Sequence, residues 1–168
     1  TSMLDTRRHP GKLASVGLPS ATADVRIISP AGTEVAPGEI GEVVGRSPTV
    51  MCGYHGRPDL TEQALIRLGN GQVYLRTGDL GRFDADGFLH LAGRAKDVII
   101  SGGYNIYATD LEEALLTPPA VLEAAVTGVP SADWGETPVG FVVLQAGADA
   151  PAEGLRTHAN ARLGKVQR

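Results

Sequence analysis

Short apolar segments separated by turn residues dominate residues 24–101. Two connections, SPAGTEVAPGE (29–39) and FDADGF (83–88), place Gly, Pro and Asp where the chain must reverse, which predicts hairpins. The apolar segments have the length and β-branched content of strands, and they are DVRII (24–28), GEIGEVVG (38–45), VYLR (73–76), GFLHLAG (87–93) and DVIIS (97–101).

One helix is predicted to interrupt these strands. Pro58 and Asp59 precede LTEQALIRL (60–68), in which the apolar residues at positions 60, 64, 65 and 68 fall on one helical face. Gly69 follows the last of them, as expected just past a helix end. The segment is expected to be a packing helix.

After residue 104 the hairpins give way to alternating helices and strands. Thr109 followed three residues later by Glu112 forms a capping-box signature, and Pro118 ends the apolar pattern, so a helix is predicted at about 109–117. Two strands and a last helix are predicted next, at EAAVTGV (123–129), TPVGFVVLQ (137–145) and PAEGLRTHANARL (151–163). The change of pattern places a boundary near residues 93–97, followed by an α+β unit.

Composition narrows the class of protein. The chain has 168 residues, 42% of them hydrophobic and 20% charged, with a formal net charge of −4, so it is expected to be globular and to lack a bulk electrostatic grip on nucleic acid or anionic membrane. The apolar run VGFVVL (139–144) is far shorter than the roughly 20 residues of a membrane span, and no basic-then-apolar leader opens the chain. Cys52 is the only cysteine, which excludes an internal disulfide. A soluble, cytoplasmic protein is expected, and nothing indicates an oligomeric state.

Asp79 is the first candidate binding residue. In YLRTGDLGRFD (74–84) it follows Thr77 and Gly78 between two apparent strands, so its carboxylate could project from a tight turn and accept hydrogen bonds from paired hydroxyls, as a sugar would offer. An Asp that bonds the amides of its own turn explains the same residues.

Arg94 and a glycine pair are the other candidates. Arg94 ends a strand fifteen residues after Asp79 and could offer a planar fork of donors to a ribose or phosphate, or form a surface salt bridge with Asp97. Gly102 and Gly103 permit close approach of a ligand, although a plain turn after a strand explains them equally well.

Other chemistries find no support in the sequence. The four histidines, at positions 9, 55, 90 and 158, show no metal-ligand spacing, so no metal site is predicted. The chain has no G-x-x-x-x-G-K-[ST] loop, no G-x-G-x-x-G after a strand and no G-x-S-x-G elbow. No catalytic nucleophile is assigned.

Taken together, the segments resemble a known family more specifically than any one of them does. The blocks GYHGRPDLTEQAL (53–65), YLRTGDLGRFDADGFLHLAGRAKDVIISGGYNIYATDLEEALL (74–116) and EAAVTGVPSADWGE (123–136) resemble, in order and spacing, the carboxyl-terminal part of adenylate-forming enzymes. This superfamily includes acyl-CoA synthetases, peptide-synthetase adenylation domains and luciferases. The resemblance extends from about residue 15 to the end.

The resemblance implies a fold and a division into domains. Residues 1–93 would be the strand-rich end of a large amino-terminal domain, a distorted β-barrel. Residues 94–97 would be a hinge, and residues 98–168 a small, mobile α+β domain. The expected fold class is therefore α+β.

The resemblance also implies roles for six residues. Asp79 matches the T-G-D aspartate that holds the ribose hydroxyls of ATP or AMP, and Arg94 matches the arginine that contacts the ribose or its phosphate side. Lys96 matches the pivot about which the small domain rotates. Gly102, Gly103 and Tyr104 would line the tunnel for the thiol of CoA.

The sequence departs from the family pattern in the small domain. Ala108 and Thr109 stand where the family usually has Pro and a small residue, and Gln167 aligns near a usual lysine. The family's catalytic lysine belongs to a P-x-x-x-x-G-K pattern that this sequence does not contain, so Lys165 is not that lysine. No catalytic residue is assigned.

The function implied is that of an ATP-dependent acyl-CoA ligase acting on a small carboxylic acid, fatty or aromatic, with Mg²⁺ as a further requirement. The 168-residue chain by itself is expected to be inactive. Two alternatives remain open at this stage: a non-catalytic interaction or regulatory module with the same fold, and an adenylation domain that loads a carrier protein.

Overall fold

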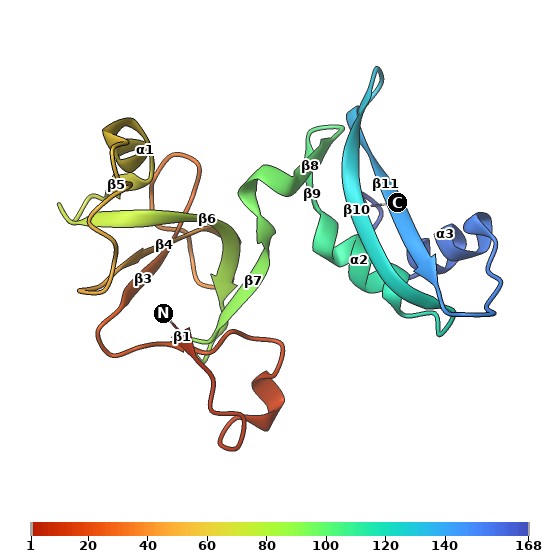
Figure 1. Ribbon diagram of the computed structural model, residues 1–168, viewed down its shortest axis with the longest axis horizontal. Helices are drawn as coiled ribbons and strands as arrows, with labels where there is room; N and C mark the ends of the chain where they lie inside the picture. Colours follow the sequence, from red (N-terminus) through yellow and green to blue (C-terminus); the bar gives the residue numbers. More distant parts are fainter. Residues whose placement is uncertain (1, 168) are drawn as a thin grey trace. The chain divides into compact units, whose positions relative to one another are not determined.

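The computed structural model describes residues 2–167. The chain divides into two compact units, Thr1–Ala95 and Lys96–Arg168 (Figure 1). Each unit has its own sheet and its own buried core, and each is described separately below.

The first unit is built on one antiparallel sheet of five strands. β6 is central: β4 pairs along one of its edges, while β5 pairs with the beginning and β7 with the end of its other edge. The predicted hairpins β3–β4 and β6–β7 are confirmed. The strands are β3 (Asp24–Ile28), β4 (Gly41–Arg46), β5 (Leu65–Arg67), β6 (Val73–Phe83) and β7 (Leu89–Arg94).

The sheet of the first unit buries side chains on both faces. Ile28, Val44 and Tyr74 form one cluster with Leu68, whereas the preceding residues of the same two strands, Ile27 and Val43, pack with Leu89 in another. Successive side chains of a strand point to opposite faces, so an uninterrupted apolar pair such as Ile27–Ile28 supplies both clusters.

The predicted helix at 60–68 is wrong in its second half. α1 spans Pro58–Gln63 and ends where the N–H of Ala64 donates to the Leu60 carbonyl. The chain then extends as β5, in which Ile66 pairs with Tyr74 and packs on the buried cluster around it. Backbone pairing with β6 and burial of Ile66 outweigh the local helical periodicity, which is only a weak preference.

The segment before β3 is tied to the β6–β7 hairpin. It contains β1 (Ser2–Met3), the short helix η1 (Pro10–Lys12) and β2 (Leu18–Pro19), which pairs with β1. The Val16 N–H donates to the carbonyl of Leu89 (2.8 Å), and the Leu89 N–H donates to that of Gly17 (2.9 Å).

A charged cluster strengthens this tie. The Lys12 ammonium donates to the carboxylates of Asp84 (2.7 Å) and Asp86 (2.6 Å), and His90 Nε2 lies 3.0 Å from the same Asp84 oxygen. The hydrogen bond from Lys12, with a second from His90, lowers the pKa of Asp84, and the bond to Asp84 raises the pKa of Lys12.

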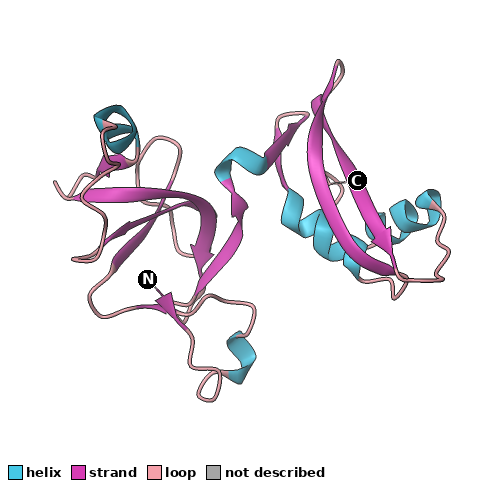
Figure 2. Ribbon diagram, viewed as in Figure 1, coloured by secondary structure: helices cyan, strands magenta, loops and turns pink. Residues whose placement is uncertain are grey.

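The second unit packs two helices against a four-stranded sheet with the strand order β10-β11-β8-β9 (Figure 2). Its predicted strands and helices are confirmed, with boundaries that differ by a few residues. The elements are β8 (Val98–Ser101), β9 (Tyr104–Tyr107), α2 (Ala108–Leu116), β10 (Val121–Ser131), β11 (Gly135–Leu144) and α3 (Ala152–Asn160), and the short helix η2 (Ala95–Asp97) precedes them.

The predicted capping box at Thr109 is wrong. The residue at the N-cap is Tyr107, so Thr109 already lies in the first turn of α2, and Glu112 instead accepts the N–H of Val126 at 2.9 Å. The reason is that β9 runs directly into α2, which moves the helix start upstream. Glu112 thereby fastens the helix to β10.

The arrangement of strands and helices confirms the α+β class. Strands pair antiparallel throughout the described residues, and α2 and α3 pack together in the second unit around buried Ile99, Ile106 and Leu111. Of the helices that the structure describes, none is long and apolar enough to cross a membrane.

Asp84→Asn is expected to lower the melting temperature at pH 7 more than Asp86→Asn does. The folded state depresses the pKa of Asp84, so its stabilisation is complete above the ordinary value of 3.8 and is lost as the pH falls through the lowered pKa. Melting curves from pH 7 to pH 2 should show the difference between the two variants shrinking below about pH 4. A difference that stays constant with pH would contradict this ionic role.

Candidate nucleotide-binding site

Asp79 lies in a bulge of β6. On one side of the bulge Leu80 pairs with Glu42, and on the other side Arg76 pairs with Val44. The three residues at positions 77–79 therefore face the single residue Val43, so β6 carries two residues more than β4 over this stretch. A bulge bends its strand and re-aims side chains without ending the pairing.

Thr77 and Gly78 hold the bulge together. The Thr77 hydroxyl donates to the carbonyl of Val43 (2.7 Å) and accepts the backbone N–H of Asp79 (3.0 Å). Gly78 has a φ of 73°, a conformation that costs glycine nothing but that residues with a Cβ rarely adopt.

The expected tight turn between two strands at Asp79 is therefore wrong. Val73–Phe83 is one continuous strand, because β4 and β7 pair with it beyond the bulge as well. The Thr-Gly-Asp sequence has the residue types of a turn, but here the same local conformation is inserted into a strand.

The bulge brings Asp79 opposite Arg94. The two residues are Cα partners in the pairing of β6 with β7, and Arg94 Nε lies 3.0 Å from Asp79 Oδ1. Arg94 therefore pairs with Asp79 rather than with Asp97. Within residues 2–167, no backbone amide donates to the Asp79 carboxylate, so the alternative in which it bonds its own turn is also wrong.

This pair presents an acceptor and a donor side by side at the surface. The side chain of Asp79 is 31% exposed and that of Arg94 is 56% exposed. A carboxylate can accept from two adjacent hydroxyls, and a guanidinium can donate to hydroxyl or phosphate oxygens. The arrangement suits a polyhydroxyl ligand that carries negative charge, such as a nucleotide.

Neighbouring charges are already neutralised. Arg76, which flanks the bulge, forms a two-pronged contact with Glu42 on β4, with Nε 3.2 Å and Nη2 2.5 Å from the two carboxylate oxygens. This hydrogen-bonded contact raises the pKa of Arg76. The contact spans the bulge, so the guanidinium of Arg76 already has a carboxylate partner although its side chain is 42% exposed.

In the second unit, the glycine pair forms the turn between β8 and β9. Gly102 has a φ of 57° and Gly103 a φ of 82°. Both residues are therefore in the left-handed region, which favours glycine. Tyr104, just after them, is 56% exposed. Ligand approach to this loop remains a prediction.

Trp134, in the turn between β10 and β11, contacts this loop and is not among the residues that the sequence singled out. It accepts the Gly102 N–H on its backbone carbonyl (2.8 Å), and its indole covers Gly102 so closely that an added Cβ would lie 2.9 Å from Cε3. The signal was present, since Trp134 is the only tryptophan and stands in a turn. Its indole is also 60% exposed.

Lys96 is the first residue of the second unit and lies in η2. The boundary between the units follows Ala95 directly, two residues after the end of the predicted 1–93 domain. Its role as a pivot remains a prediction.

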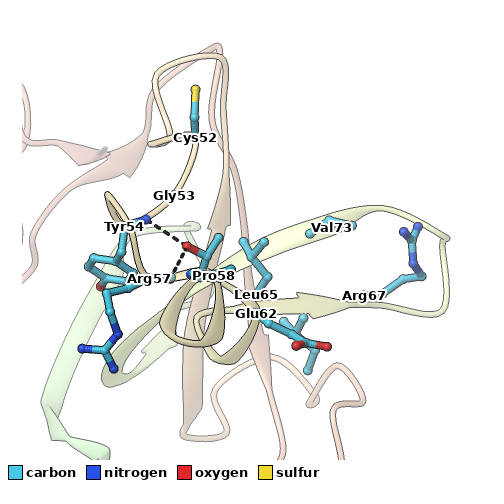
Figure 3. Close-up of a pocket in the computed structure, with 12 residues that line it drawn as sticks. Cys52, Gly53, Tyr54, Arg57, Pro58, Glu62, Leu65, Arg67 and Val73 are labelled. Carbon is cyan, nitrogen blue, oxygen red and sulfur yellow. Dashed lines mark hydrogen bonds between the residues drawn. The ribbon is translucent and has the colours of Figure 1, made fainter.

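The pocket drawn in Figure 3 is a separate feature of the first unit. It lies around α1 and β5, and none of the site residues predicted from sequence lines it. Thr61 accepts the N–H of Tyr54 (2.9 Å) and donates to the carbonyl of Arg57 (3.0 Å), and Arg57 in turn pairs with Asp59 (2.7 Å). These polar groups are hydrogen-bonded to or paired with one another, so the pocket is assigned no ligand.

A metal site finds no support in the part of the chain that the structure describes. No group of three or more His, Cys, Asp or Glu side chains there could hold an ion. Mg²⁺ is therefore assigned no residue of this chain.

Residues 110–168 match the family model described as the AMP-binding enzyme C-terminal domain. Over 156 residues, the chain is 42% identical to sulfoacetate--CoA ligase of Cupriavidus necator and 44% identical to 2-succinylbenzoate--CoA ligase of Geobacillus kaustophilus. The alignments cover 93% of this chain but 30% and 31% of the two relatives. The chain thus spans about a third of the length of the relatives it matches.

Solved structures show the same fold. ATP-bound MatB from Rhodopseudomonas palustris superposes with a TM-score of 0.84 at 34% identity, covering 92% of this chain and 30% of that one. The o-succinylbenzoate CoA synthetase MenE from Bacillus subtilis, in complex with the acyl-adenylate OSB-AMP, gives 0.85 at 36% identity, covering 98% and 32%.

Sequence and fold together define the class of protein. The chain belongs to the adenylate-forming superfamily, as the resemblance predicted. The relatives named above are CoA ligases or CoA synthetases, and residues 110–168 match the C-terminal domain of AMP-binding enzymes.

Gly102→Ala and Gly103→Ala should separate backbone strain from the tryptophan contact. Both variants place a Cβ at positive φ, which costs about 1 kcal/mol of stability each. Only Gly102→Ala must displace the indole of Trp134, because nothing lies within 4 Å of a Cβ added at Gly103. Emission of the single tryptophan should therefore shift in the first variant alone, and equal spectra would contradict the contact.

Proposed function

We propose that this chain is the nucleotide-contacting and hinge-bearing part of an AMP-forming acid–thiol ligase, an acyl-CoA synthetase. The parent enzyme joins a carboxylic acid to ATP as an acyl-adenylate, with release of pyrophosphate, and then transfers the acyl group to the thiol of CoA. The 168-residue chain alone is inactive in this proposal.

The observation that carries the proposal is the Asp79–Arg94 pair at the bulge of β6. Asp79 accepts hydrogen bonds from the ribose hydroxyls, and Arg94 donates to the ribose or to the phosphate beside it. The 3.0 Å ion pair holds the two side chains side by side, and both are partly exposed to a ligand. Because both residues belong to the first unit, the assignment does not depend on the second.

The relatives support the same chemistry. Their names include ligases for sulfoacetate, 2-succinylbenzoate and long-chain fatty acids, as well as a feruloyl-CoA synthase. All of these names describe formation of a CoA thioester from a carboxylic acid. The acids are chemically diverse, and we propose a fatty or aromatic acid for this enzyme.

The second unit acts in the thioester step. Adenylation requires positive charge around the departing pyrophosphate, whereas thioester formation requires that space to be clear for a thiol. A single fixed arrangement of side chains cannot stabilise both transition states well. We propose that the second unit turns about Lys96 between the steps, and that Gly102, Gly103 and Tyr104 then line the path of the thiol.

Carboxylate-dependent exchange of pyrophosphate into ATP tests the proposed function. It should be measured across fatty and aromatic acids, on this 168-residue chain and on the full-length product of its gene. Exchange by the full-length product alone supports the proposal and identifies the acid. Absence of exchange in both would favour a non-catalytic module, and transfer to a carrier protein instead of CoA would favour a carrier-loading enzyme.

Asp79→Asn in the full-length product should raise the KM for ATP about 10- to 150-fold, because a charged hydrogen-bond acceptor is worth roughly 1.5–3 kcal/mol. Asp59→Asn is the matched control, since Asp59 is likewise paired with an arginine on the first unit, at 2.7 Å. Its KM should stay within about twofold of the unsubstituted protein. An unchanged KM for ATP in Asp79→Asn would contradict the proposed contact between Asp79 and the ribose hydroxyls.

Lys96→Pro should slow thioester formation more than pyrophosphate exchange. Proline fixes φ and stiffens the backbone at the proposed pivot, while the first unit keeps its nucleotide contacts. Lys96→Ala, which removes the charge without stiffening the chain, serves as the control. Equal loss in both half-reactions would overturn the pivot assignment.

A further inference from the structure

We infer that Thr77 is a positioning residue for the nucleotide contact: its hydroxyl holds the bulge of β6 in the one form that sets Asp79 against Arg94. The inference rests on the proposed nucleotide role of Asp79 and adds a residue that acts through it. Thr77 itself need not touch the ligand.

The carbonyl of Val43 needs a hydrogen-bond donor at the bulge. Val43 is a buried residue, 5% exposed, on a strand paired on both sides, and a buried carbonyl without a partner is costly. The bulge places three residues opposite it and interrupts the regular ladder. The Thr77 hydroxyl donates to this carbonyl at 2.7 Å and so gives it a hydrogen-bond partner inside the bulge.

The same hydroxyl also binds the backbone of Asp79. Its N–H donates to the oxygen of the same hydroxyl, at 3.0 Å. One hydroxyl therefore fastens the bulge to β4 and also fixes the peptide that carries Asp79. Because the direction of a Cα–Cβ bond follows from its backbone, this contact sets the direction in which the Asp79 side chain leaves the strand.

Threonine has the chemistry and the shape that position 77 requires. The task needs a group that donates and accepts at once, which a hydroxyl does and an aliphatic side chain does not. The β-branch of Thr77 restricts χ1 and suits a strand, so the hydroxyl is held in one orientation. Thr77→Val keeps the shape and loses both hydrogen bonds, whereas Thr77→Ser keeps the hydroxyl.

The structure also supplies a matched control. The Thr61 hydroxyl makes the same pair of contacts in the same unit: it accepts the Tyr54 N–H (2.9 Å) and donates to the Arg57 carbonyl (3.0 Å). Neither contact involves Asp79, β6 or β7. Thr61→Val thus removes the same chemistry without disturbing the bulge.

The experiment measures KM for ATP and kcat of pyrophosphate exchange in the full-length product of the gene. Thr77→Val should raise the KM about 5- to 20-fold, as expected from two lost neutral hydrogen bonds, with a smaller change in kcat. Thr77→Ser and Thr61→Val should stay within about twofold of the unsubstituted protein. Thr77→Ala provides a second test if the valine variant does not fold.

A second measurement reports the geometry directly. In ¹⁵N spectra of the 168-residue chain, Thr77→Val should shift the Asp79 amide and the Arg94 Nε–H signals and speed exchange of the Asp79 amide with solvent. Thr77→Ser should restore both signals. Thr61→Val should leave them in place.

The outcomes separate this inference from the proposed function. Suppose that Asp79→Asn raises the KM for ATP. If Thr77→Val then leaves the KM unchanged, or if Thr61→Val raises it equally, the positioning role of Thr77 is overturned and the proposed function stands. An unchanged KM in Asp79→Asn overturns the nucleotide role and this inference with it. A KM for ATP in Thr77→Ser as high as that of Thr77→Val also overturns the positioning role.

Discussion

The hydrogen bond from Thr77 to the carbonyl of Val43 is the constraint on which the proposed site depends. β6 must pair with β4 on both sides of the bulge while accommodating two additional residues, and the buried carbonyl opposite them must still find a donor. The threonine hydroxyl meets that requirement, and glycine at position 78 supplies the positive φ. Arg94 enters only because β7 pairs with the stretch of β6 that the bulge has redirected.

The same strand links the first unit's stability to its site. β6 is bordered by β4, β5 and β7, and Tyr74, which is fully buried, anchors its beginning. Its end leads into the β6–β7 hairpin, where Asp84 binds Lys12 and His90. The bulge thus lies between a buried end and a hydrogen-bonded end of β6, which favours a fixed position for Asp79 over a mobile loop.

In the second unit, the backbone with positive φ lies in a turn between two strands and not in a bulge within one strand. Its glycine pair lies at a turn, and the exposed Trp134 approaches Gly102 more closely than a Cβ there would allow. Burial is confined to the contacts of α2 and α3 with each other and with the sheet, while Phe141 on β11 remains 60% exposed. An arrangement with a bare backbone loop and an exposed aromatic ring agrees with the proposed passage of a long, flexible thiol.

The sequence by itself determined the strand-rich first half, both hairpins, the helices of the second half and the superfamily, because each rests on local periodicity, turn residues or ordered motifs. It also singled out Asp79 and Arg94. Only the tertiary structure decided that Leu65–Arg67 is a strand, that Glu112 binds β10 and that Thr-Gly-Asp is a bulge. Each of these depends on a partner far along the chain, and a single sequence records residue types but not which distant strand will pair with them.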